Sequence, residues 1–383
     1  MQSVRVYPSK LSGCISIPPS KSHTMRALIF ASMAQSPSKL LNLLPSPDTD
    51  CMTEALKLLG VGFDSGFVIP GPLKVPKDPI YAGNSGQVYR FIRALAPVDM
   101  VGDFSIQTRR PIQPLLDGLK QIEKGCARID GRDSQPVSAM LMHMAFRSGK
   151  SELFVDNPGE TPWVAMTLSW FDKLGIAYTN DAFSHFTVTG PAMYSGFTYT
   201  VPADFSSAAF PWAINLITGS SLHLANLEMD LAQGDHRLLE LDPLSGGTID
   251  VNAFIDSVPI LATLGCYAQK PLTLTNAAIS RQKESDRIHA MTVELSKMGA
   301  QIEESRDGMT IYPSPLHGAE VFSHDDHRVA MALIVAALGA SNPSIVHGAQ
   351  CIDKSFPHFI QKVNQCSCSL ALQVLEKAPL ARL

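Results

Sequence analysis

The sequence predicts an α/β protein built from repeated units. Residues 58–72, 173–191 and 297–315 each show the end of a helix rich in Leu and Met, a small-residue turn, and two short strands that close on Gly-Pro or Pro-Ser. In each segment Leu-Gly or Met-Gly-Ala supplies the C-terminal cap of the helix, and we expect a β-hairpin after it. A repeat of about 60 residues indicates stacked α/β units rather than one continuous sheet.

Two further helices resemble this repeat but leave no room for the hairpin. The helical segments Pro114–Lys124 and Asp235–Glu240 run almost directly into strand-like residues 125–130 and 244–250. The sequence therefore predicts that two of the units are truncated. The proline-containing segments 18–19 and 201–204 are candidate crossovers, so we expect one domain of residues 1–18 and 204–383, containing both termini, and an inserted domain of residues 19–203.

Composition excludes several classes of function. With 383 residues, 45% hydrophobic content and a net charge of −4, the chain can bury a large core but is not expected to bind nucleic acid or a membrane surface. The start lacks a signal-peptide core, and the apolar run Val329–Ala340 is too short to span a bilayer, which predicts a cytoplasmic protein. Seven scattered cysteines form no zinc-type pattern, so we expect reduced thiols and no metal.

The most informative segment is Arg281–Arg287, where five of seven residues are charged at the start of a stretch with helical apolar spacing. The field of a helix N-terminus favours Glu284 and Asp286 but not three cations, so the segment indicates an anion site. Lys283 offers an ammonium, Arg287 a planar fork one helical turn later, and Glu284 a carboxylate that could move a proton. A solvated, salt-bridged helix start is the competing interpretation.

Three other segments carry cations at predicted helix starts. Lys21 and Ser22 begin a helix and Arg26 follows about one turn later, which suits a bound phosphate or carboxylate. Residues 83–86 (Gly-Asn-Ser-Gly) open a helix that carries Arg90, and their glycines would let a ligand approach the backbone closely. Residues 109–110 are an arginine pair before a proline. A plain turn or an exposed loop explains the last two equally well, and no Walker A sequence supports nucleotide binding.

Two later segments and three carboxylates complete the candidates. Residues 325–328 (Asp-Asp-His-Arg) precede an apolar helix, where a charged group is hard to explain as surface. Lys354 is a lone loop lysine, which by itself would be expected in solvent. Glu284, Asp256 and Asp204 are the carboxylates suited to acid–base work, and partial burial of Asp256 in its apolar stretch would tune its pKa.

Taken in order, eight short motifs resemble those of the 5-enolpyruvylshikimate-3-phosphate (EPSP) synthase family of enolpyruvyl transferases. The resemblance covers the chain from Pro18 to Pro357. Its motifs are Pro-x-Ser-Lys-Ser-x-x-x-Arg, Gly-Asn-Ser-Gly-x-x-x-Arg, Arg-Pro-Ile, Ser-Gln, Asp-x-Ser-Ser-Ala, Lys-Glu-Ser-Asp-Arg, Asp-His-Arg-x-Ala-Met and Lys-Ser-Phe-Pro. The resemblance implies two similar domains built from repeated βαβαββ units, an inside-out α/β barrel, with helix N-termini facing an active-site cleft between them.

The family's activity and site residues follow by the same resemblance. It implies transfer of the enolpyruvyl group of phosphoenolpyruvate to the 5-hydroxyl of shikimate-3-phosphate with release of phosphate, by a monomer that uses no cofactor or metal. The phosphoenolpyruvate site would comprise Lys21, Gly86, Arg110, Gln135, Arg287, Arg328 and Lys354. The shikimate-3-phosphate site would comprise Lys21, Ser22, Arg26, Ser134, Gln135, Asp256 and Lys283. Asp256 would take the hydroxyl proton, Glu284 would protonate the methylene carbon, and Lys21 would balance charge as the third catalytic residue.

Two departures from the family pattern place carboxylates near the expected substrate phosphate. Asp133 stands in the usual Ser-Ser-Gln motif, and Glu160 begins the segment that is usually Ser-x-Pro-Tyr. We expect their side chains to turn away or to pair with Lys283 or Arg26. Two alternatives stay open: a transferase acting on UDP-N-acetylglucosamine, whose reactive loop cysteine is absent from residues 105–114, and a non-catalytic anion-binding relative, which the truncated units favour and the retained carboxylates oppose.

Overall fold

The computed structural model describes residues 1–375, which fall into two compact units. Unit 1 comprises Met1–Pro18, Ala203–Met229 and the chain from Asp235 onward, and unit 2 comprises Pro19–Pro202 with Asp230–Gly234. The brief return of residues 230–234 to unit 2 was not expected from the sequence. Residues 376–383, which the sequence analysis assigns to the domain with both termini, lie outside the described residues.

Unit 1 combines ten strands and five α-helices within the described residues. The strands are β1 (Ser3–Val6), β2 (Ser12–Ser16), β13 (Ser221–Ala225), β14 (Gly247–Asp250), β15 (Leu272–Thr275), β16 (Gln301–Ser305), β17 (Gly308–Tyr312), β18 (Glu320–Phe322), β19 (Ser344–His347) and β20 (Leu372–Leu375). The helices are α8 (Phe205–Thr218), α9 (Val258–Cys266), α10 (Arg287–Lys297), α11 (His327–Leu338) and α12 (Phe359–Gln365). Short 3₁₀ helices occur at η1 (Gly234–Glu240), η2 (Pro243–Ser245), η3 (Asn252–Ser257), η4 (Ala278–Gln282) and η5 (Ala349–Lys354).

Unit 2 has a similar mixture of elements. Its strands are β3 (Ser38–Leu41), β4 (Gly62–Asp64), β5 (Phe67–Ile69), β6 (Ile80–Tyr81), β7 (Met100–Val101), β8 (Cys126–Asp130), β9 (Gly149–Asp156), β10 (Tyr178–Asp181), β11 (His185–Gly190) and β12 (Thr198–Thr200). Its helices are α1 (Lys21–Ser32), α2 (Pro47–Leu58), α3 (Gly86–Leu95), α4 (Phe104–Thr108), α5 (Gln113–Ile122), α6 (Ser134–Phe146) and α7 (Thr161–Leu174). The predicted α/β class is confirmed.

The sheets of the described residues share one pattern of strand pairing. Four sheets have four strands, in the orders β18-β19-β1-β20, β14-β15-β17-β16, β12-β3-β5-β4 and β10-β11-β9-β8. Each contains one parallel pair and two antiparallel pairs. Two sheets, β13-β2 and β6-β7, consist of a parallel pair alone. The three hairpins expected from the repeat are present as β4–β5, β10–β11 and β16–β17.

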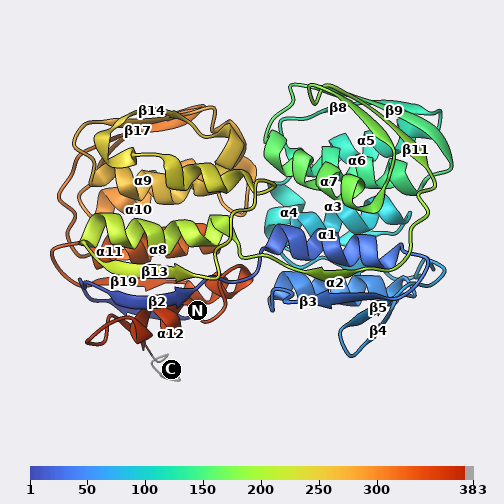
Figure 1. The fold of residues 1–383 in the computed structure, drawn as a ribbon. Coiled ribbons are helices and arrows are strands. Elements are labelled where there is room, and N and C mark those ends of the chain that lie inside the picture. Colours follow the sequence, from blue (N-terminus) through green and yellow to red (C-terminus); the bar gives the residue numbers. More distant parts are fainter. Residues whose placement is uncertain (376–383) are drawn as a thin grey trace, which may run out of the picture. The chain divides into compact units, whose positions relative to one another are not determined.

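In both units the long helices lie inside and the sheets lie outside (Figure 1). Every residue of α11 is buried, and so are ten of the twelve residues of α1. A helix with no exposed face cannot show an amphipathic pattern, which explains why small and apolar residues dominate α11. The burial expected for the stretch beginning at Val329 is therefore confirmed.

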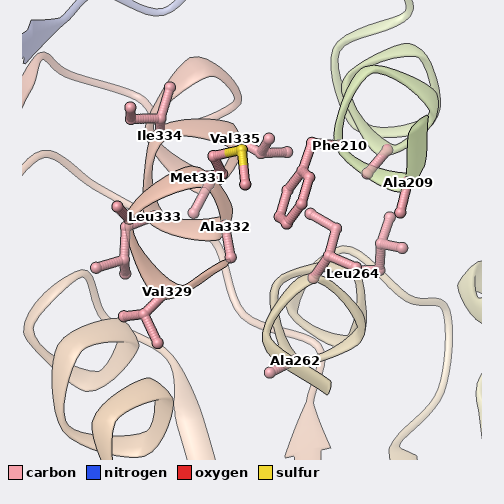
Figure 2. Close-up of a cluster of buried hydrophobic side chains, with 14 of the residues drawn as sticks. Ala209, Phe210, Ala262, Leu264, Val329, Met331, Ala332, Leu333, Ile334 and Val335 are labelled. Carbon is pink, nitrogen blue, oxygen red and sulfur yellow. The ribbon is translucent and has the colours of Figure 1, made fainter. Parts of the chain in front are cut away.

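The core of unit 1 forms where α8, α9 and α11 meet. Figure 2 shows Phe210 of α8 among Leu264 of α9 and Met331 and Val335 of α11. Phe210 is 1% exposed and the other three are completely buried. Because these three helices carry Asp204, Asp256 and Arg328 at or next to their N-terminal ends, their packing fixes the position of the charged groups described below.

Replacement of Phe210 by Ala is expected to lower the free energy of unfolding by about 3–5 kcal/mol, because the lost ring leaves a cavity that rigid helices cannot fill. Urea unfolding monitored by circular dichroism measures the change. Replacement of the exposed Phe104 by Ala is the control and should cost less than about 0.5 kcal/mol. Equal losses in the two variants would show that the helix contacts of unit 1 are not tightly packed.

Two other properties of the described residues concern binding. No helix in this part of the chain is long and apolar enough to cross a membrane. Over the same range, no group of three or more His, Cys, Asp or Glu side chains is arranged to hold a metal ion.

Candidate active site

The charged segment around Glu284 precedes helix α10, which begins later in the chain than the sequence suggested. Asp286 is the N-cap of α10, and its side chain accepts a hydrogen bond from the backbone N–H of His289 at 3.0 Å. Arg287 is therefore the first helical residue, and the expectation that it lies one helical turn after Lys283 was wrong. Residues 283–286 instead form a loop between η4 and α10. The Asp286 carboxylate thereby satisfies one of the free N–H groups of the first turn.

Arg287 is the centre of a buried ion-pair cluster in unit 1. Its side chain is 1% exposed, and its donors reach three carboxylates: Nε lies 2.8 Å from Asp326 Oδ2, Nη1 lies 2.7 Å from Asp256 Oδ1, and Nη2 lies 2.9 Å from Glu284 Oε2. Burial lowers the pKa of Arg287, but the three carboxylates outweigh burial and raise it. The guanidinium thus stays charged and fixes three acids at once. We call Asp256, Glu284, Arg287, Asp326, Arg328 and Lys354 the Arg287 cluster.

Asp256 lies between two arginines of this cluster. In addition to Arg287, Arg328 Nη2 lies 3.0 Å from Asp256 Oδ2, and the same nitrogen donates to Ser206 Oγ at 2.9 Å. Burial raises the pKa of Asp256, but the charges of Arg328, Arg287 and Lys283 together hold it well below its usual value. About a quarter of the side chain is exposed, so a ligand can reach this carboxylate.

Glu284 is held by cations on both oxygens. Arg287 contacts Oε2, and Lys354 Nζ donates to Oε1 at 2.9 Å across 70 residues of chain. Both Glu284 and Lys354 side chains are 8% exposed. The exposed loop lysine that position 354 alone suggests is therefore not observed, because η5 places the ammonium next to Glu284. The interpretation of residues 281–287 as a solvated helix start also fails for Glu284 and Arg287.

Asp326 contacts both arginines of the cluster. It is completely buried at the N-cap of α11, where Oδ1 accepts from the backbone N–H of Arg328 at 2.9 Å and Oδ2 accepts from Ser285 Oγ at 3.1 Å. One carboxylate thereby positions both arginines of the cluster. The sequence analysis noted the Asp-Asp-His-Arg group but assigned no role to Asp326, and helix capping was the signal that could have identified it.

Unit 2 carries a second group of candidates at the N-termini of α1, α3 and α6. Lys21 opens α1, and its Nζ lies 3.4 Å from Asp48 Oδ2. Ser22 Oγ receives a hydrogen bond from Gln87 Nε2 of α3 at 3.3 Å. Ser20 caps α1 and Ser85 caps α3, each by accepting from the backbone N–H three residues later. These caps leave other N–H groups of the first turns available for an anion.

Arg90 joins α3 to α6. Its Nη2 lies 3.1 Å from Asp133 Oδ2, and its Nη1 donates to Gln135 Oε1 at 2.8 Å. Burial lowers the pKa of Arg90, and the Asp133 carboxylate partly opposes that effect. Nearby, Arg110 Nη2 donates to Asn84 Oδ1 at 3.3 Å. We call Lys21, Ser22, Gly86, Arg90, Arg110, Asp133 and Gln135 the Arg90 cluster.

Gly86 is the point of closest packing in the Arg90 cluster. A Cβ atom at this position would lie 2.6 Å from Arg90 Nη1, 2.7 Å from Gln135 Oε1 and 3.1 Å from Arg110 Nη1. No side chain larger than hydrogen fits without moving a charged neighbour. The sequence analysis proposed that glycine serves close approach here, and packing against these side chains is a second reason for it.

Asp133 and Glu160, the two carboxylates that depart from the family pattern, both form hydrogen bonds within the protein. Asp133 caps α6 by accepting from the backbone N–H of Gln135 at 3.0 Å and also pairs with Arg90. Glu160 is buried, and its Oε2 accepts from both the N–H and the hydroxyl of Ser134, at 2.9 and 2.8 Å. Glu160 has a left-handed backbone with φ of 46°, uncommon for a residue with a side chain.

Arg26 donates several hydrogen bonds to other residues of unit 2. Its guanidinium is buried and donates to Thr167 Oγ1, Ser138 Oγ and the carbonyls of Ser22 and Trp163. Burial lowers its pKa to about 9. Arg26 has neither Asp133 nor Glu160 among these partners, so the pairing with Arg26, one of the alternatives expected from the sequence, is not observed in these contacts. Its hydrogen bonds join α1 to α6 and α7, which makes it a structural residue as well as a binding candidate.

The predicted residues are thus gathered into two clusters, one in each unit. The Arg287 cluster holds Asp256, Glu284, Arg287, Arg328 and Lys354, and Lys283 lies close enough to lower the pKa of Asp256. The Arg90 cluster holds Lys21, Ser22, Gly86, Arg110 and Gln135, with Ser134 and Arg26 on adjoining helices. Two carboxylates beside cations can exchange protons with a ligand, and the cations can bind anionic groups.

Two solved structures with this fold are named as an EPSP synthase and an enolpyruvyl transferase. An EPSP synthase from Acinetobacter baumannii superposes with a TM-score of 0.79 at 24% identity, covering 98% of this chain and 100% of that chain. The enolpyruvyl transferase NikO from Streptomyces tendae superposes with a TM-score of 0.74 at 14% identity, covering 98% and 99%. At these identities the likeness shows that the chain shares the fold of these two proteins.

Sequence comparison shows the family to which the chain belongs. The model of the EPSP synthase (3-phosphoshikimate 1-carboxyvinyltransferase) family matches residues 6–242 and 239–363, and the chain belongs to that family. A 3-phosphoshikimate 1-carboxyvinyltransferase of Chlamydia caviae is 39% identical over 423 aligned positions, covering 97% of this chain and 95% of the relative. The protein of the same name from Chlamydia felis is 40% identical over 417 positions, covering 95% and 93%.

Proposed function

We propose that the protein transfers the enolpyruvyl group of phosphoenolpyruvate to the 5-hydroxyl of shikimate-3-phosphate and releases phosphate, a step of aromatic amino acid biosynthesis. The observation that carries the proposal is the paired arrangement in the Arg287 cluster, where Asp256 and Glu284 each lie between two cations. The chemistry needs one group that accepts a proton from oxygen and one that delivers a proton to carbon. Family membership and the names of the relatives support the choice of substrates.

Binding of phosphoenolpyruvate supplies a reason for Glu284 to become an acid. The substrate carries phosphate and carboxylate groups, which compete with Glu284 for Lys354 and Arg287. As those cations turn to the substrate, the carboxyl of Glu284 loses the partners that favour its charged form. Glu284 then holds a proton more readily and can deliver it to the methylene carbon of the substrate.

The same competition makes Asp256 a better base. In the structure Arg328 and Arg287 lower the pKa of Asp256, so the carboxylate alone is a weak proton acceptor. A substrate anion that binds Arg328 weakens the stabilisation of the charged form of Asp256. The proton of the acceptor hydroxyl can then move to Asp256. The hydroxyl oxygen then bonds to C2 of phosphoenolpyruvate to give a tetrahedral intermediate. Glu284 then takes a proton back from the new methyl group, Asp256 gives its proton to the leaving phosphate oxygen, and the C2–O bond to phosphate breaks. Both carboxyls are thereby restored to their starting states.

The remaining contacts are assigned to the two substrates by the family resemblance. Phosphoenolpyruvate takes Lys21, Gly86, Arg110, Gln135, Arg287, Arg328 and Lys354. Shikimate-3-phosphate takes Lys21, Ser22, Arg26, Ser134, Gln135, Asp256 and Lys283. The pairing of Asp133 with Arg90, and of Glu160 with Ser134, supports this assignment because both acids have protein partners to limit their repulsion of a phosphate.

We also infer that each domain contains three βαβαββ units and that one unit in each is truncated. The β13-β2 and β6-β7 sheets are the candidates, because each has the parallel pair of the other sheets without the antiparallel strands. The comparison with the Chlamydia caviae relative supports this inference: 423 aligned positions against 383 residues leave at least 40 positions where this chain has no residue. A cytoplasmic location and a monomeric state stay predictions.

A phosphate-release assay tests the proposed function. The protein is incubated with phosphoenolpyruvate and either shikimate-3-phosphate, UDP-N-acetylglucosamine or no acceptor. We expect phosphate release only with shikimate-3-phosphate. Release with UDP-N-acetylglucosamine would assign the sister activity, and no release with either acceptor would identify a non-catalytic relative.

Gly86→Ala tests the Arg90 cluster separately. The added methyl group meets Arg90, Gln135 and Arg110, so we expect the KM for phosphoenolpyruvate to rise by roughly tenfold, about 1.4 kcal/mol of binding energy, with a smaller change in turnover. The matched control is Gly149→Ala, whose added Cβ meets no atom within 4 Å, although its left-handed backbone lowers stability slightly. An unchanged KM in Gly86→Ala would remove Arg110 and Gln135 from the phosphoenolpyruvate site.

A further inference from the structure

A fourth carboxyl group lies next to the three of the Arg287 cluster, and the mechanism above does not use it. Asp235, in η1, is 1% exposed. Its Oδ1 accepts a hydrogen bond from Ser257 Oγ at 3.0 Å, and Ser257 directly follows Asp256 in η3. Within the part of the chain that the structure describes, Asp235 Oδ2 has no hydrogen-bond partner.

Among the described residues, no cation forms an ion pair with Asp235. The charged groups that influence it are Asp256 of η3, Asp204 at the start of α8, and Arg328 of α11. Arg328 directs its donors to Asp256 Oδ2 and to the hydroxyl and carbonyl of Ser206. Asp235 is thus a buried acid that has two carboxylates in its surroundings and a single neutral donor.

A carboxylate in such a place is costly, whereas a neutral carboxylic acid is tolerated. Burial and the charge of Asp256 raise the pKa of Asp235 to about 7, from a usual value of 3.8. The pKa of Asp235 is therefore raised and that of Asp256 is lowered relative to an ordinary Asp, although Ser257 follows Asp256 in the chain and donates to Asp235. The cause is that Arg287 and Arg328 form ion pairs with Asp256, whereas at Asp235 the charge of Arg328 only partly offsets the effects of burial and of Asp256.

We propose that Asp235 is a positioning residue that works as a neutral acid: it holds Ser257, and so the turn carrying Asp256, without placing negative charge near Arg328. This inference rests on the proposed function, because Arg328 is assigned to phosphoenolpyruvate. Ionisation of Asp235 would add a negative charge that competes with substrate anions for Arg328. The affinity for phosphoenolpyruvate is then expected to fall as pH rises through the pKa of Asp235, near 7.

The effect on stability has a definite sign. An unfolded Asp ionises near its usual pKa of 3.8, whereas folding keeps Asp235 protonated up to about pH 7. Between these values the folded state binds the extra proton, so rising pH favours the unfolded state, and above about pH 7 the penalty stays constant. Asp235→Asn removes the penalty and keeps an oxygen that can accept from Ser257.

The experiment compares the wild type with Asp235→Asn, using Asp250→Asn on exposed β14 as the control. The KM for phosphoenolpyruvate is measured from pH 6 to pH 8 at saturating shikimate-3-phosphate. We expect the ratio of the wild-type KM to that of Asp235→Asn to be near one at pH 6 and to reach roughly threefold to tenfold at pH 8, the size of one added charge at moderate distance. Ionisation of the substrate phosphate cancels in this ratio, and the control should track the wild type.

Thermal unfolding of the same proteins gives a readout that needs no substrate. The difference in Tm between Asp235→Asn and the wild type should grow from pH 4 to pH 7 and level off above. If Asp235→Asn does not fold, Ser257→Ala replaces it: losing the one donor should move the pH transition of wild-type stability upward. Parallel pH curves for variant and wild type in KM and Tm would overturn the inference. Absence of turnover in the wild type would reject the proposed function, while Tm would still decide the state of Asp235.

Discussion

Glu284→Gln is expected to lower turnover by roughly 10²–10⁴-fold, the range for loss of a positioned acid or base. The amide keeps the shape of the side chain and can still accept a hydrogen bond from Lys354 or Arg287, but it has no proton to deliver to carbon. The KM values for the two substrates should change much less, because the cations that hold the anions remain. Steady-state kinetics with both substrates measures the effect.

Glu294→Gln is the matched control for this variant. Glu294 is also a buried glutamate of unit 1 with two side-chain partners, since it pairs with Lys297 at 2.7 Å and lies 2.8 Å from His324, but it does not belong to the Arg287 cluster. Its replacement should reduce stability and leave turnover within a few-fold of the wild type. If Glu284→Gln behaved like Glu294→Gln, with a structural cost and nearly normal turnover, Glu284 would be only an ion-pair partner.

Arg287→Met is expected to lower the free energy of unfolding by about 3–5 kcal/mol, because three carboxylates that share one buried guanidinium would lose it together. Met fills a similar volume, so the loss reports charge rather than a cavity. The effect is measured by urea unfolding at pH 7.

Arg281→Met provides the comparison for this loss. Arg281 also pairs with two carboxylates, those of Asp286 and Glu304, but its side chain is 23% exposed. Water screens such a pair, and its removal should cost about 1 kcal/mol or less. Similar losses for the two arginines would mean that the Arg287 cluster is solvated in solution, which would also remove the reason for the opposite pKa changes at Asp256 and Asp235.

The sequence predicted the elements whose signals are local. Gly60, Gly175 and Gly299 follow helices with the positive φ that a helix end requires, and a hairpin follows each of them. The burial of α11 could be predicted because its composition admits no polar face. The start of α10 was missed because Arg281–Asp286 contains several residues that suit a first helical turn, and only the tertiary position of Asp286 decides which of them caps the helix.

In the charged site, too, residues with a local sequence signal were identified from that signal, and those whose role depends on tertiary contacts were not. The segment around Glu284 is dense in charge and draws attention, whereas Lys354 stands alone in the sequence and gains meaning only from its contact 70 residues away. Asp235 gave no signal at all, because its unusual state comes from burial and from arginines that bind a neighbouring acid. The identities of the ligands came from the family motifs, since no spacing of charges distinguishes one small anion from another.

The most direct test of the account is the exchange of solvent deuterium into the methylene group of phosphoenolpyruvate, measured by NMR in the presence of shikimate-3-phosphate. Each exchange requires protonation of that carbon and its reversal, so the experiment observes the proposed role of Glu284 without product release. The account predicts that exchange occurs with the wild type and slows in Glu284→Gln in parallel with turnover. Exchange at the wild-type rate in Glu284→Gln would contradict it and would transfer the acid role to another residue, with Lys21 the next candidate.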